Sequence, residues 1–215
     1  MTEGGDMPEI YLDGEKIELS DFNNDWSLLL KQIYDRIGKM KKGIIKITAD
    51  GDDITRIISG VKLEKTPDNY QRIEINTLDI SQIAFNGIEN VKKFLPNLIK
   101  ILKGAAEFAR LGEDDKKNEA INGSLEGIKL VITLFINIHN LYKFDINSIK
   151  LKNGDTLASQ FTNLNKIFEV FNNAQQRQDN VEIADIIEYE ILPAIKKFDE
   201  VFDVIKGEVK DKIVV

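Results

Sequence analysis

The spacing between apolar residues changes once along this 215-residue chain. Up to about Asn76 the apolar residues alternate with a period near 2, as in half-buried strands. Beyond that point they keep the 3.6-residue period of amphipathic helices. A single switch of this kind predicts an α+β protein, with a small strand-rich module before a helical bundle. We predict a flexible leader over 1–8, a module over 9–77, a bundle over 78–207 and a frayed tail over 208–215.

The first part of the chain contains two Asp-Gly pairs. Asp13-Gly14 and Asp50-Gly51 each lie between short β-rich runs. Such a pair favours the type I′ turn of a β-hairpin, because both central residues of that turn need a positive φ. We therefore predict two hairpins, the second with a return strand over 54–58.

A helix is predicted between the two hairpins. Apolar residues recur at helical spacing from Trp26 to Ile37, and either Asp25 or Asn24 before them can be the N-cap. Lysines follow, and Gly43 is the residue expected to close the helix in a left-handed conformation. With a last alternating strand over 71–76, the order becomes ββαββ(β), the plan of a β-grasp-like α+β module.

The second part of the chain contains four long amphipathic segments joined by short connections. Such segments predict an antiparallel four-helix bundle. Pro96 and Pro193 lie inside the first and the last of them, where each is expected to kink or interrupt the helix. The predicted helices cover residues 78–111, 114–142, 155–177 and 179–206.

The most apolar run of the chain extends from Ile128 to Ile138. Its apolar residues surround nearly the whole helix, which predicts a helix buried on most sides. The same run could instead mediate dimerisation. It is about half as long as a membrane-spanning helix, so we expect no membrane insertion. The first residues carry neither a basic region nor an apolar stretch, so we also expect no signal peptide.

The chain has no cysteine and one histidine, His139. Zinc fingers, iron–sulfur centres and cysteine nucleophiles are therefore excluded. A di-iron carboxylate bundle is excluded too, because it needs two Glu-x-x-His motifs. The net charge of −7 argues against nucleic acid as the ligand, and the sequence contains no phosphate-binding glycine motif. We expect neither a cofactor nor a resident metal.

Acidic residues crowd the start of the last predicted helix. Glu182, Asp185 and Tyr189 share one helical face, and Glu188 is close to it. Carboxylates on one face can bind Mg²⁺ or Ca²⁺, or act as acid and base. The alternative is a solvated face that complements the helix dipole, since acids favour N-termini. These four residues are the candidate ligand-binding group.

Aromatic rings at the ends of elements are a second set of candidates. Phe22, Trp26, Tyr70 and Tyr142 have this placement, which suits protein interfaces. His139 ends the most apolar helix, either as a base or pH sensor or as a packed residue near a helix end. We take these five residues as candidate interaction residues.

These patterns favour a soluble, cytoplasmic, non-catalytic protein that binds another protein or a second copy of itself, as an adaptor or chaperone-like module. Nucleic acid and membrane are not expected partners. The alternative is a carboxylate-based enzyme, or a binder of a small ligand or divalent cation, that uses the acidic start of the last helix.

Overall fold

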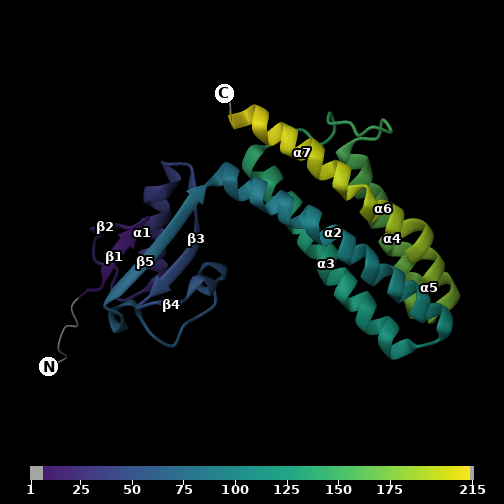
Figure 1. The fold of residues 1–215 in the computed structure, drawn as a ribbon, viewed down its shortest axis with the longest axis horizontal. Helices are drawn as coiled ribbons and strands as arrows, with labels where there is room; N and C mark the ends of the chain where they lie inside the picture. Colours follow the sequence, from purple (N-terminus) through teal and green to yellow (C-terminus); the bar gives the residue numbers. More distant parts are fainter. Residues whose placement is uncertain (1–6, 214–215) are drawn as a thin grey trace. The chain divides into compact units, whose positions relative to one another are not determined.

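The computed structural model describes residues 7–213, with side chains as far as residue 210 (Figure 1). The chain forms two compact units, an N-terminal unit up to Ile83 and a helical unit from Ala84 onward. Most of the predicted leader and the last two residues of the predicted tail lie outside the described residues. The final helix continues to Ile213, beyond residue 208, where the tail was expected to begin.

The N-terminal unit is a five-stranded mixed sheet with one helix, α1 (Trp26–Gly38). Strand β1 pairs antiparallel with β2 and parallel with β5, while β3 pairs antiparallel with both β4 and β5. Helix α1 buries Leu29, Ile33 and Ile37 in one cluster with apolar residues of the sheet. The strand order is β2 (Glu15–Ile17), β1 (Glu9–Leu12), β5 (Arg72–Asp79), β3 (Lys42–Ala49) and β4 (Asp52–Asp53).

Both predicted Asp-Gly turns are confirmed. Asp13 and Gly14 have φ values of 51° and 85°, and Asp50 and Gly51 have 48° and 89°. The first turn places Ile10 opposite Ile17 in the hairpin, so two apolar side chains share the buried face of the sheet. The local preference for positive φ therefore sets the register of the first hairpin.

The predicted return strand over 54–58 is wrong. Strand β4 has only two residues, and a 3₁₀ helix, η1 (Thr55–Ser59), follows it. The carboxylate of Asp53 accepts the backbone N–H of Thr55 at 2.9 Å, and the hydroxyl of Thr55 accepts the N–H of Ile47 at 3.0 Å. A side chain thus takes the edge position on β3 that a continuing strand would occupy, and the ladder ends.

The end of α1 also differs from the expectation. Of the two N-cap candidates, Asp25 is the cap, because its side chain accepts the N–H of Ser27. At the other end Lys41, with φ 52°, takes the left-handed position, and Gly43 lies inside β3. A Cβ on Gly43 would stand 2.8 Å from Cδ1 of Ile83, so the glycine serves a close approach rather than a helix end.

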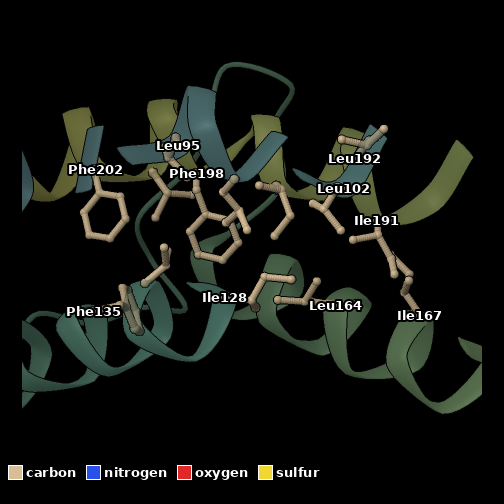
Figure 2. Close-up of a cluster of buried hydrophobic side chains, with 14 of the residues drawn as sticks. Leu95, Leu102, Ile128, Phe135, Leu164, Ile167, Ile191, Leu192, Phe198 and Phe202 are labelled. Atoms are coloured by element: carbon tan, nitrogen blue, oxygen red, sulfur yellow. The ribbon is translucent and has the colours of Figure 1, made fainter. Parts of the chain in front are cut away.

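The helical unit consists of about four helices packed together, the last of them divided into segments. Figure 2 shows labelled side chains from all four pointing into one shared interior, among them Leu102, Phe135, Leu164 and Phe202. The helices are α2 (Ile80–Leu111), α3 (Asp114–Tyr142), α4 (Leu157–Arg177), and then α5 (Asn180–Ile186), the π-helix η3 (Ile187–Ile191), α6 (Leu192–Lys196) and α7 (Phe198–Ile213).

The two internal prolines behave differently. Helix α2 is not split at Pro96 and runs through it as one element. Pro193 does interrupt the last helix. The π-helix η3 directly precedes α6, and Pro193 lies in the first turn of α6. Proline has no N–H to donate and its ring crowds the carbonyl four residues earlier, so the wider π turn relieves this conflict without ending the helix.

Candidate interaction surface

Helix α3 is exposed over much of its most apolar stretch. The prediction that residues 128–138 are buried on most sides is wrong, since Leu130 is 65% exposed and Ile136 is 46% exposed. Leu125 and Leu141 are exposed as well. Leu125 and Ile136 are eleven residues apart, close to three helical turns, and therefore share one flank; Leu130 and Leu141 share another.

Among the described helices, α3 is also the one that is long and apolar enough to cross a membrane by length and composition. Core helices of water-soluble proteins pass the same test when they are mostly buried. Here only 39% of the most apolar 18-residue stretch is buried inside the protein. Its apolar surface is therefore only partly accounted for by packing within this chain.

One exposed flank of α3 borders an open groove of about 470 Å³, which we call the α3/α4 groove. Leu125, Ile132 and Ile136 form its α3 side, and Phe168 lies opposite on α4. The remaining lining is buried Ile128 and the polar residues Lys129, Thr133 and Asn172. The groove thus combines apolar side chains with a few polar groups.

Three of the four predicted ligand residues pair with two arginines. The guanidinium of Arg110 on α2 pairs with Asp185 at 3.2 Å and with Glu188, so α2 brings these two carboxylates together. These carboxylates, Glu188 first, raise the pKa of Arg110 above its already high ordinary value. The guanidinium occupies the place between the two acids that a cation ligand would need.

The other two members of this group lie apart from that pair. Glu182 forms its own ion pair with Arg177, and Tyr189 is exposed. Within residues 7–213, no three His, Asp or Glu side chains are grouped so that they could hold a metal ion. The chemistry of this region is therefore that of ion pairs that fasten α5 and η3 to α2 and α4.

Three of the predicted aromatic residues gather in the N-terminal unit. Phe22 and Tyr70 lie inside its core rather than on its surface. Trp26 is half-buried, packs against the Tyr70 ring at 5.9 Å and donates its indole N–H to the carbonyl of Lys65 at 2.9 Å. An open groove of about 630 Å³ adjoins Trp26, with Val61 exposed beside it.

His139 and Tyr142 end α3. The imidazole of His139 stacks on Phe135 at 6.2 Å and meets Phe144 edge-on at 5.0 Å. Its backbone carbonyl accepts the N–H of Lys143, which closes the helix in a left-handed conformation. Tyr142 is half-buried, and this burial raises the pKa of its phenol. His139 thus belongs to an aromatic cluster with Phe135 and Phe144, and Tyr142 packs against the apolar core of the helical unit.

A family model described as "Domain of unknown function (DUF8042)" matches residues 86–201, more than half of the chain. The chain belongs to this family. The DUF8042 match begins in α2 and ends in the first turn of α7, so it covers most of the helical unit and none of the sheet. The whole α3/α4 groove lies inside the matched residues. The comparison with curated proteins finds no match, and the comparison with solved structures finds none either.

Proposed function

We propose that the DUF8042 region is a non-catalytic protein-interaction module, of an adaptor or chaperone-like kind, whose α3/α4 groove receives an apolar helix of another protein. The single observation that supports this function most is the exposed apolar flank of α3 beside Phe168. Removing apolar surface from water is worth about 25 cal/mol per Å². A partner that covers Leu125 and Ile136 gains that energy without any rearrangement of the core.

The groove has the chemistry of helix-in-groove recognition. Apolar residues at helical spacing on the partner would contact Leu125, Ile132 and Ile136, which follow one line of α3. Lys129 and Asn172 border these residues and can fix the orientation of the bound helix by hydrogen bonds, as polar rims do in protein interfaces.

The alternative carboxylate function has less support. Arg110 pairs with both Asp185 and Glu188, and Arg177 pairs with Glu182. A catalytic or cation-binding role would first have to displace these guanidinium groups. We therefore do not propose an enzymatic activity for the acidic start of α5.

We also infer a finer description of the two units. A β-grasp-like class for the N-terminal unit is supported by the parallel pairing of β1 with β5 and by a helix that connects the first hairpin to β3. An antiparallel bundle for the helical unit is supported by its connections, since only residues 112–113 separate α2 from α3.

The test uses two matched double variants. Leu125→Gln with Ile136→Gln changes the groove flank, and Leu130→Gln with Leu141→Gln makes the same chemical change on the other flank of the same helix. A photo-crosslinking amino acid placed at Thr133 reports what occupies the groove in the native host. Circular dichroism melting confirms that all variants are folded, as expected for exposed positions.

We expect a protein adduct at position 133 that disappears with the groove variant and persists with the other. The proposal is contradicted if both double variants keep the adduct equally or lose it equally. It is also contradicted if no protein adduct forms at position 133. Light scattering of the purified chain tests whether the occupant is a second copy. In that case the chain and the Leu130→Gln, Leu141→Gln variant are dimers, whereas the Leu125→Gln, Ile136→Gln variant is a monomer.

A further inference from the structure

A buried lysine lies in the first turn of α3. Lys117 is 6% exposed, and its ammonium donates to Oδ1 of Asp114 at 2.5 Å and to Oδ1 of Asn180 at 2.6 Å. Burying an ammonium is costly unless it is well paired. A cation near a helix N-terminus is also disfavoured by the helix dipole. Burial and the helix dipole therefore both disfavour a charged lysine at this position.

This lysine lines a pocket at one end of the helical unit, with a volume of about 270 Å³. The pocket lies where the first turn of α3, the end of α4 and the start of α5 meet. Its lining is polar apart from Ile183, in contrast to the α3/α4 groove. The lining residues are Asp114, Lys117, Asn118, Gln175, Gln178, Asn180 and Ile183.

The polar groups of this pocket have hydrogen-bonding capacity that the described residues do not use. An ammonium has three N–H donors, and Lys117 spends two of them. Oδ1 of Asp114 accepts from both Lys117 and Asn180, whereas Oδ2 accepts from no described residue. The side-chain amides of Asn118, Gln175 and Gln178 likewise bond to no described residue.

We propose that this pocket binds a small zwitterion, a free α-amino acid with a polar, uncharged side chain. Its carboxylate accepts the third N–H of Lys117, and its ammonium donates to Oδ2 of Asp114. Together they extend the existing ion pair into an alternating arrangement of four charges. The amides of Gln175 and Gln178 are donors and acceptors for a neutral polar side chain.

The size of the pocket agrees with this class of ligand. The pocket volume of about 270 Å³ lies just below the range of about 300–1,000 Å³ that small-molecule pockets span, which suits a ligand as small as a free amino acid. The lining carries one positive and one negative charge, so it favours a ligand whose own net charge is zero. This inference is independent of the α3/α4 groove, and either one can fail without the other.

The test titrates the full chain with glutamine, asparagine and serine, and follows heat of binding and the methyl NMR signals of Ile183. N-acetylglutamine lacks the ammonium, and glutamine α-amide lacks the carboxylate. We expect millimolar or tighter binding of at least one free amino acid, and a loss of about tenfold or more with each blocked analogue. No binding of any of the three up to about 10 mM, or equal binding of the blocked analogues, overturns the proposal.

Two variants connect this binding to the pocket. Lys117→Met removes the ammonium, and Lys116→Met removes the exposed neighbouring ammonium as a matched control. Binding should be lost with Lys117→Met and kept with Lys116→Met. If Lys117→Met does not fold, Gln178→Leu at an exposed position replaces it. Binding that survives the folded pocket variant contradicts the assignment of the site.

Discussion

The carboxylate of Asp13 accepts both the backbone N–H and the hydroxyl of Thr77, two bonds of 2.7 Å between residues 64 positions apart. Lys42 donates to the same carboxylate at 2.8 Å. The turn of the first hairpin is thereby fastened to β5 and β3. Burial raises the pKa of Asp13, but the bonds from Lys42 and Thr77 outweigh it and leave that pKa below its usual value.

Asp13→Asn tests this connection without disturbing the turn, because asparagine also tolerates the positive φ of this position. We expect the free energy of unfolding at pH 7 to fall by about 2 kcal/mol, since hydrogen bonds to a charged group are lost. Urea unfolding followed by the emission of Trp26, the single tryptophan, measures it. Asp52→Asn, in exposed β4, is the control and should change stability by less than about 0.5 kcal/mol.

The lowered pKa of Asp13 predicts that the stability difference between wild type and Asp13→Asn depends on pH. A carboxyl whose pKa is lowered by folding stabilises the protein fully above its unfolded pKa, near 3.9, and this stabilisation is lost as the pH falls through the lower folded value. The difference between wild type and Asp13→Asn should therefore be constant above about pH 5 and shrink on further acidification. Parallel stability curves down to about pH 2 would show that the charge of Asp13 contributes nothing.

The sequence predicted those parts of the fold that depend on local chemistry. Asp13-Gly14 forms its turn because two neighbouring residues accept positive φ, and Asp25 caps α1 because its own side chain reaches the next turn. Gly43 was misread because its neighbour Ile83 is forty positions away. Residues 54–58 were misread because the hydroxyl of Thr55 takes the place of a strand partner beside Ile47.

The candidate sites were harder to predict than the fold, because they depend on contacts between residues that are distant in the sequence. Leu130 and Val131 are adjacent and equally apolar, yet one is 65% exposed and the other is fully buried. Sequence periodicity does not show which side of an apolar helix the chain itself covers. The pairing of Asp185 with Arg110, 75 positions away, and the burial of Lys117 beside Asn180 were likewise unreadable from spacing.

A pair of leucine truncations should separate core from surface in the helical unit. Leu98→Ala removes a fully buried side chain of α2, and we expect a loss of about 3 kcal/mol in unfolding free energy. Leu130→Ala removes a mostly exposed one and should change stability by less than about 0.5 kcal/mol. Denaturant unfolding followed by far-ultraviolet circular dichroism measures both. A comparable loss in the two variants would mean that Leu130 is covered, for example by a second copy of the chain.

The ion pair of Lys117 with Asp114 should respond unequally to removal of its two partners. Asp114→Asn leaves a buried ammonium without a counter-charge, whereas Lys117→Met leaves a carboxylate that is largely exposed to water. We therefore expect Asp114→Asn to lower the melting temperature more than Lys117→Met does. The double variant should melt above Asp114→Asn alone, and a double variant below both single ones would contradict this account.

Two glycines of α3, one turn apart, provide the last prediction. A Cβ on Gly123 would meet nothing within 4 Å, whereas a Cβ on Gly127 would stand 3.0 Å from Leu98 and from Phe94 of α2. Gly123→Ala should stabilise the protein by about 0.5–1 kcal/mol, because alanine loses less backbone entropy in a helix. Gly127→Ala should gain clearly less, and Gly127→Val should cost about 1–3 kcal/mol through overpacking. Thermal unfolding of the three variants measures the order, and equal stabilisation by alanine at both positions would show that α2 and α3 do not depend on Gly127 for their close approach.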